Sequence, residues 1–214
     1  MIRICVVLVL LVCGLGAPGI AYGEEAPDEP KLEGEALKAH KKAVKAHLKF
    51  LKGEKNKALV ISQIESLGVE GSRAGRDALI KFANRNKNQE QLRAIFLALA
   101  KIGGKTSIEF LAGKQALRAK GFMTQQSAAD ALGEAKDARA TAPLLEVMTS
   151  KRTKIEVVGA CAKALAQTAP DDEVVVETLF EQSQHKSDTI RSYTLEAIGY
   201  LKTDEAMARL EDAL

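Results

Sequence analysis

Side chains that could act as nucleophiles or metal ligands are few in this 214-residue chain, which has three histidines and three cysteines. His40 and His47 are seven residues apart, about two helical turns, which is too far for two ligands of one metal on a single helix. We expect both to pack at the apolar border of their helix, with a pH-sensitive contact as the alternative. His185 stands in a polar segment and is predicted to be exposed in a turn.

Cys161 is the one thiol outside the N-terminal segment that contains Cys5 and Cys13. It lies five residues before the end of a repeated motif described below, at a position where other repeats have Ala128 and Thr194. We therefore expect it to be buried and unreactive. No histidine is near it in the sequence, and neither a glycine-rich phosphate loop nor a nucleophile elbow occurs. The sequence predicts no catalytic residue, no metal site and no cofactor.

A different chemistry, the binding of anions, is indicated by the lysine-rich segment 35–54. On a helix with about 100° per residue, its lysines fall within an arc of about 100°, beside the aliphatic side chains that would face the protein. These lysines are Lys38, Lys41, Lys42, Lys45, Lys49 and Lys52. The face fits anionic lipid or acidic polysaccharide, and the alternative is the solvated side of a capping helix. The lysines lack the interleaved aromatic residues of a stacking platform, which argues against nucleic acid.

The first 23 residues have the order of a secretory signal, with Arg3, an apolar stretch of about 12 residues and small residues up to Gly23. The apolar stretch is shorter than the roughly 20 residues that a membrane-spanning helix needs. We expect cleavage after Gly23 and export to the periplasm or the medium. An uncleaved anchor and lipoprotein processing at Cys13 are the alternatives. Residues 24–34 are acidic and contain two prolines, which predicts a flexible linker.

An internal repeat organises residues 55–214. A short motif of a small residue, an aliphatic residue and then glycine or alanine recurs, and its last residues are 35, 30, 33 and 33 positions apart. These last residues are Gly68, Gly103, Gly133, Ala166 and Gly199. Placing the second motif about two residues earlier would make the first two intervals more even. Each motif ends a segment with helical spacing, and a polar turn and a second apolar segment follow, so the unit is a helical hairpin.

The composition agrees with stacked helices. An apolar content of 46%, a charged content of 28% and a net charge of +3 exclude a disordered chain and a bundle of membrane spans. With 33 alanines and only 4% aromatic residues, the chain favours closely packed helices over a β-sandwich. We expect the motif glycines to end their helices with positive φ. Asp137, Asp171 and Asp204 are predicted to cap the helices that follow or to place a carboxylate early in them, against the helix dipole.

Residues 131–145 and 190–199 are similar to HEAT-type repeats, specifically to the short variety first associated with phycobilisome lyases. The resemblance implies an all-α fold, a right-handed α-α solenoid of about five HEAT-like hairpins, with the helix at 35–54 as its N-terminal cap. It also implies that the first helices lie on the convex side and the second helices line the concave side. The fourth repeat departs from the pattern at Val158 and Ala166. We expect residues 210–214 to close the C-terminal end.

HEAT-type repeats serve many unrelated partners, and some are enzymes. The family includes bilin lyases, and the deoxyhypusine hydroxylases hold iron through His-Glu pairs. Here Lys41, Leu48 and Lys186 follow the three histidines, so the residues of such an oxidoreductase are missing. We favour a non-enzymatic scaffold or adaptor that binds a protein partner through the concave face, over a HEAT-like lyase or oxidoreductase. The predicted contacts are exposed residues of the second helices and of the turns before them: Arg73, Arg76, Lys114, Arg118, Arg139 and Glu146.

Charge is distributed unevenly along the chain. Residues 31–57 contain 9 lysines and 3 glutamates, whereas residues 171–214 contain 4 basic and 11 acidic residues. One hypothesis is that this gradient steers a bipolar partner, and a second is head-to-tail self-association through the opposite ends. The alternative is that both ends are only soluble caps. An anionic envelope surface remains a second candidate partner, bound through the lysine-rich helix.

Overall fold

The structure is a computed structural model that describes residues 30–201 and residue 208. Within this part of the chain ten α-helices and one turn of 3₁₀ helix follow one another, and no strand occurs. The helices are α1 (Gly34–Gly53), α2 (Lys57–Glu70), α3 (Arg73–Ala83), α4 (Gln89–Ile102), α5 (Gly104–Leu111), α6 (Phe122–Ala135), η1 (Ala138–Ala140), α7 (Thr141–Thr149), α8 (Ile155–Thr168), α9 (Glu173–Ser183) and α10 (Asp188–Leu201). The predicted signal peptide, most of the predicted linker, the Asp204 cap and the predicted C-terminal closure lie outside the described residues.

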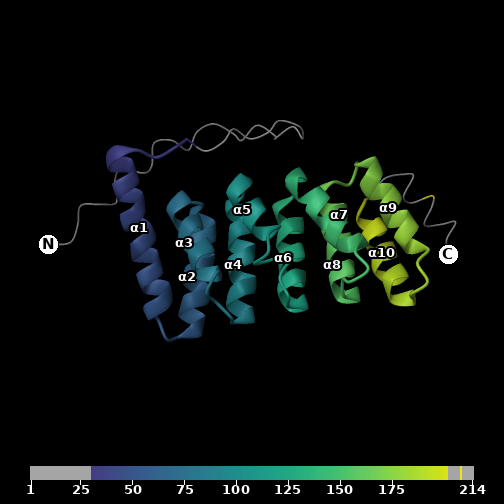
Figure 1. The fold of residues 1–214 in the computed structure, drawn as a ribbon, viewed down its shortest axis with the longest axis horizontal. Coiled ribbons are helices and arrows are strands. Elements are labelled where there is room, and N and C mark those ends of the chain that lie inside the picture. The colour runs from purple at the N-terminus through teal and green to yellow at the C-terminus, as the bar shows by residue number, and fades with distance from the viewer. Residues whose placement is uncertain (1–29, 202–207, 209–214) are drawn as a thin grey trace.

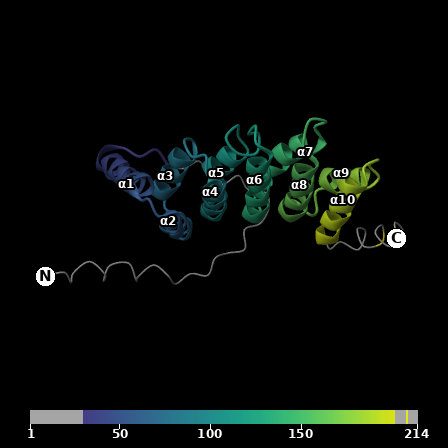
Figure 2. The same cartoon turned by 90° about the horizontal axis from the view of Figure 1, so that it is seen from below.

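The helices form two parallel rows (Figures 1 and 2). Helices α1, α3, α5, α7 and α9 make one row, and α2, α4, α6, α8 and α10 make the other. Successive hairpins stack along one axis, and each packs only on its neighbours. The protein is an α-solenoid, which confirms the predicted fold class.

The positions of the two rows are opposite to the prediction. Seen along the helices, the stack is curved, and the row that begins with α2 lies on the inner side (Figure 2). These inner helices pack directly on one another, α2 on α4, α4 on α6, α6 on α8 and α8 on α10. Beyond the contact of α1 with α3, the outer helices pack mainly on the inner row. The first helix of each predicted hairpin therefore lines the concave side, because close packing makes that row the shorter one.

Glycine at the repeated motif makes this close packing feasible. Gly68 and Gly133 lie inside α2 and α6, not at their ends. A Cβ atom built on Gly68 would lie 2.9 Å from the Cα atom of Ala98, and one on Gly133 would lie 2.9 Å from the Cα atom of Ala164. Gly199 also lies inside its helix. The prediction that these three glycines end their helices is wrong, since at two of them the side of the next helix needs the space.

The residues that do end the helices lie three positions after the small residue at which neighbouring helices touch. Gly71, Gly103 and Lys136 have φ values of 66°, 67° and 50° and follow α2, α4 and α6. The prediction was thus correct for Gly103, which is a C-cap. The residue of α4 that occupies the repeat position of Gly68 and Gly133 is Ala100, a buried small residue. With Ala100 as the second motif end, the intervals from Gly68 to Gly199 become 32, 33, 33 and 33 residues.

Lys136 is the one non-glycine residue with positive φ in the described part of the chain. A left-handed conformation costs about 1 kcal/mol for a residue with a Cβ atom, and glycine avoids this cost. We therefore expect Lys136→Gly to raise the free energy of unfolding by about 1 kcal/mol, measured by urea denaturation. An equal gain from Lys136→Ala would contradict this explanation, because alanine keeps the Cβ atom.

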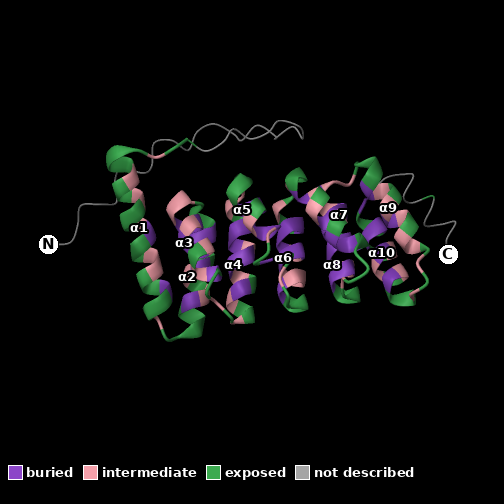
Figure 3. Cartoon of the chain, in the orientation of Figure 1, coloured by how far each residue is buried: buried purple, intermediate pink, exposed green. Residues whose placement is uncertain are grey.

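A single apolar core runs through the stack between the two rows (Figure 3). It is built mainly from leucine and alanine, as the composition predicted, and Phe96 is its largest fully buried side chain. Side chains at the helix starts satisfy free backbone N–H groups: Asn56, Ser72, Asn88, Asp137 and Asp172. Asp137 is a cap as predicted, whereas the cap of α9 is Asp172 and not Asp171. Among the described helices, none combines the length and apolar character that crossing a membrane requires.

Candidate functional site

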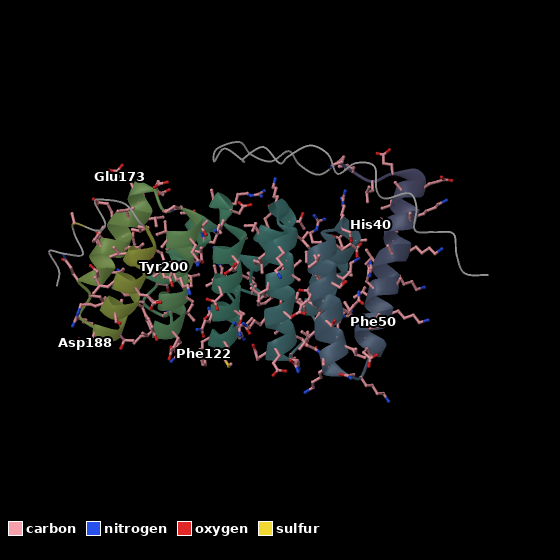
Figure 4. The ribbon with its side chains drawn as sticks, turned by 180° about the vertical axis from the view of Figure 1, so that it is seen from behind. His40, Phe50, Phe122, Glu173, Asp188 and Tyr200 are labelled. Atoms are coloured by element: carbon pink, nitrogen blue, oxygen red, sulfur yellow. The ribbon has the colours of Figure 1, made fainter. Side chains whose placement is uncertain are left out.

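The inner row carries a line of polar side chains, one from each of four consecutive helices. Asp130 of α6 lies between Arg93 of α4 and Lys163 of α8, whose positive charges both act on its carboxylate. The Nζ atom of Lys163 lies 5.4 Å from the centre of the Tyr200 ring on α10. Figure 4 shows Tyr200 at mid-height of the stack. We call these four residues the inner stripe.

Asp130 is partly buried, and burial raises the pKa of its carboxyl. Arg93 and Lys163 oppose this effect without cancelling it, and Glu134 adds to it. A raised pKa in the folded state means that stability is lost as the pH rises from the unfolded-state pKa through the folded-state pKa. The charged carboxylate of the inner stripe is therefore held at a cost to stability at neutral pH.

We expect Asp130→Asn to raise the thermal midpoint at pH 7 and to leave it nearly unchanged below about pH 3, where aspartate is protonated in both states. The variant removes the charge and keeps the shape of the side chain. Thermal denaturation across a pH series checks this prediction. A midpoint that falls at pH 7 would mean that attraction to Arg93 and Lys163 outweighs the cost of burial.

Exposed apolar side chains are concentrated on the same row. Of eight large apolar side chains that are exposed in the described residues, six belong to inner helices. They are Leu59, Val69, Phe122, Met123, Ile155 and Tyr200. Phe122 and Met123 are the first two residues of α6, and Ile155 is the first residue of the neighbouring α8. Apolar side chains next to charged ones are typical of surfaces that bind other proteins.

The predicted partner-binding residues lie on the outer row and its turns, not on the concave face. The predicted exposure of these residues is wrong most clearly for Arg76, which is only 3% exposed. Its Nε and Nη2 atoms donate to Oδ1 of Asp77 at 3.1 and 3.0 Å. Arg73, at the start of α3, is partly buried and donates from Nη1 to the Pro30 carbonyl at 2.7 Å.

The other predicted contacts are exposed, and most of them are engaged within the chain. Arg118 donates to Glu146 at 2.5 Å, and this pair lowers the pKa of the Glu146 carboxyl. Arg139 donates to its neighbour Asp137 at 2.8 and 2.5 Å, which lowers the pKa of that carboxyl. Lys114 is exposed in the turn after α5. Exposed ion pairs of this kind are screened by water and contribute little to stability.

All six predicted anion-binding lysines are exposed on α1. Four of them, with Lys81 of α3, line a groove of about 570 Å³ between α1 and α3. The four are Lys41, Lys45, Lys49 and Lys52, and Val44 and Leu48 provide apolar surface in the same groove. We call this the lysine groove. Lys38 and Lys42 lie outside its lining.

The three histidines are partly buried, and two of them make hydrogen bonds within the chain. The Nε2 atom of His40 lies 2.9 Å from Oδ2 of Asp77, so α1 and α3 are joined by a polar contact at one end of the lysine groove. His47 is partly buried on α1. The Nδ1 atom of His185 accepts from the backbone N–H of Ser187 at 3.0 Å. His185 is half-buried in its turn, so the prediction that it is an exposed turn residue is wrong.

Cys161 is buried in α8, as its repeat position predicted, and so are Ala128 and Thr194. Burial raises the pKa of its thiol to about 12, and the nearby carboxylate of Asp130 adds to this. A thiol with this pKa is protonated at neutral pH and is a poor nucleophile. Among the described residues, no three histidine, cysteine or acidic side chains gather in a way that could hold a metal ion.

Residues 124–150, which include most of α6 and all of α7, match the model of the PBS lyase HEAT-like repeat. Helical hairpins recur at intervals of 32 or 33 residues along the two-row stack described above. At residues 124–150 the chain therefore contains a HEAT-like repeat. No curated protein sequence matches the chain.

Among solved structures, the chain is similar to a chain in the complex of CpcE and CpcF of phycocyanin lyase from Nostoc sp. PCC7120. The sequence identity is 18%, and the TM-score is 0.40. The alignment covers 92% of this chain and 100% of the other chain.

The inner stripe was not found by reasoning from the sequence. Asp130 and Lys163 occupy the same position of the HEAT-like repeat, 33 residues apart, and that spacing was a usable signal. Arg93 precedes its motif end, Ala100, by seven residues, which is two turns. The signal was missed because the hairpins were assigned to the wrong sides of the curve, so attention went to the outer helices.

Proposed function

We propose that this HEAT-type protein is an exported, non-enzymatic adaptor that binds a protein partner along its inner row. The concentration of exposed apolar side chains on the inner helices carries this proposal, because such side chains gain most from being covered. The inner stripe lies on the same row and supplies charges of alternating sign, Arg93, Asp130 and Lys163. A partner segment with complementary charges would be aligned by them.

The non-enzymatic part of the proposal is supported by the state of Cys161. This thiol is buried and protonated, so it does not serve as a nucleophile. Export is supported by the order of residue types in 1–23 and by the absence of a second cysteine outside that segment. An adaptor in an oxidising compartment then depends on packing for its stability.

Cross-linking the protein in its own cell envelope, followed by mass spectrometry, would identify the partner. The purified pair then tests the surface. We expect Arg93→Glu combined with Lys163→Glu to weaken binding at least about tenfold, because both charges lie on the proposed contact surface. Isothermal titration or surface plasmon resonance measures this effect.

A matched control replaces two lysines outside the inner row, Lys114→Glu with Lys151→Glu, which changes the net charge equally. These residues are exposed in turns. The control should bind its partner within about twofold of wild type, since it leaves the proposed contact surface intact. If the control lost binding and the inner-row variant kept it, the outer surface would be the binding face and the proposal would fail.

A further inference from the structure

The lysine groove has a positive charge that no residue of its lining balances. Its lining contains five lysines and no carboxylate, and Val44 and Leu48 are the aliphatic residues that line it. The lysines Lys41, Lys45 and Lys49 are spaced at four residues, so their charges follow one another at about 6 Å along α1. An occupant that fits has carboxylates at the same spacing next to an apolar side chain.

Helix α9 has this pattern. Glu173, Glu177 and Glu181 are exposed and are also spaced at four residues, so they form one acidic edge. Val174, beside them, is 61% exposed. In the described part of the chain no basic side chain forms an ion pair with these glutamates. The acidic edge is therefore open to a partner.

The two helices lie at opposite ends of the outer row. Figure 1 places α1 at one end of the stack and α9 at the other, and Figure 4 shows His40 and Glu173 far apart in the same molecule. The acidic edge cannot reach the lysine groove of its own chain across the intervening helices. It can reach the groove of a second copy.

We infer that the protein associates head to tail, with the acidic edge of α9 of one copy docked in the lysine groove of the next. Each of the three glutamates meets one of the three lysines, and Val174 contacts the apolar surface formed by Val44 and Leu48. The contact joins two different surfaces, so it leaves one groove and one acidic edge free and adds further copies in the same way. This inference does not depend on the proposed inner-row partner.

The association is weak and depends on salt. Helix α9 has 11 residues, so it is about 16 Å long and covers much less area than the roughly 1,600 Å² of a standard stable interface. Its attraction comes mainly from charges at the protein surface, which are screened over about 8 Å at physiological ionic strength. We expect the apparent dissociation constant to rise at least about tenfold between 50 and 300 mM salt.

Charge reversal tests the inference on the full chain as purified from the expressing cell, by sedimentation velocity over a concentration series at 50 mM salt. One variant has Lys41→Glu, Lys45→Glu and Lys49→Glu, and the other has Glu173→Lys, Glu177→Lys and Glu181→Lys. Each variant alone should be monomeric, because its groove and its α9 edge then have the same sign. An equimolar mixture of the two should associate again, since each then offers the opposite charge.

A control for the groove variant, with the same change of net charge, replaces three exposed lysines elsewhere, Lys101, Lys120 and Lys151, with glutamate. It should associate like wild type. A wild-type chain that stays monomeric at all concentrations, or a mixture that fails to associate, overturns the inference. Sedimentation with vesicles containing anionic lipid is a separate arm: if the groove variant loses vesicle binding while wild type is monomeric, the groove serves a membrane surface instead.

Discussion

Gly68→Val is expected to lower the free energy of unfolding by about 3 kcal/mol, a loss that is large for a single added side chain. A Cβ atom at this position would lie 2.9 Å from both the Cα and the Cβ atoms of Ala98. One of these is a backbone atom, so the clash is not relieved by rotating a side chain. Helix α4 would have to move away from α2, and it is held on its other side by α6.

Urea denaturation followed by circular dichroism measures the loss, and Gly199→Val is the matched control. Gly199 occupies the same repeat position in α10, but among the described residues no atom lies within 4 Å of a Cβ atom built on it. We expect the control to stay within about 0.5 kcal/mol of wild type, because valine and glycine differ little in a helix where nothing is displaced. Equal losses at both positions would mean that valine acts through helix propensity and not through the contact between helices.

Asp77→Ala is expected to lower the free energy of unfolding by about 3 kcal/mol. The Asp77 carboxylate accepts from the guanidinium of Arg76 and also lies 2.9 Å from Nε2 of His40. Arg76 is 3% exposed, so its charge depends on partners inside the protein and not on water. Removing the carboxylate therefore leaves the buried charge of Arg76 without this compensating partner. It also removes the polar contact that joins α1 to α3.

The control for this second prediction is Asp188→Ala. Asp188 accepts from Nη2 of Arg191 at 2.6 Å, but its side chain is 90% exposed, so its loss should cost less than about 1 kcal/mol. Thermal and urea denaturation compare the two variants, and hydrogen exchange locates the change. We expect faster exchange in α1 of the Asp77 variant. Unchanged exchange there would show that the polar contact does not hold the N-terminal helix in place.

Much of the fold was predictable because the same helical-hairpin pattern occurs several times along the sequence. Apolar residues at helical spacing and a recurring motif of small residues predicted the helices, their order and the period. The burial of Cys161 followed from comparing it with Ala128 and Thr194 at the same repeat position. The cap at Asp137 followed from turn chemistry that acts within a few residues.

The errors concern properties that depend on neighbours distant in the sequence. Glycine near a helix end serves equally for positive φ and for a close contact with another helix, and Gly68 and Gly133 proved to serve the second purpose. Arg76 has the residue type of an exposed position, but its partner Asp77 compensates its charge inside the protein. The inner stripe combines residues from separate helices, and no local pattern indicates which of them face one another.

By itself the sequence determined the class of this protein, a stack of helical hairpins with a basic first helix and an acidic C-terminal segment at residues 171–214. It did so because helix formation depends on residues close together in the sequence, and because the same pattern recurs several times along the chain. Only the tertiary structure decided which row is concave, that α1 and α3 enclose a lysine groove, and that Asp130 lies between Arg93 and Lys163. The physical reason is that curvature and shared sites arise from how closely neighbouring hairpins pack, and this distance is set where side chains of different repeats meet.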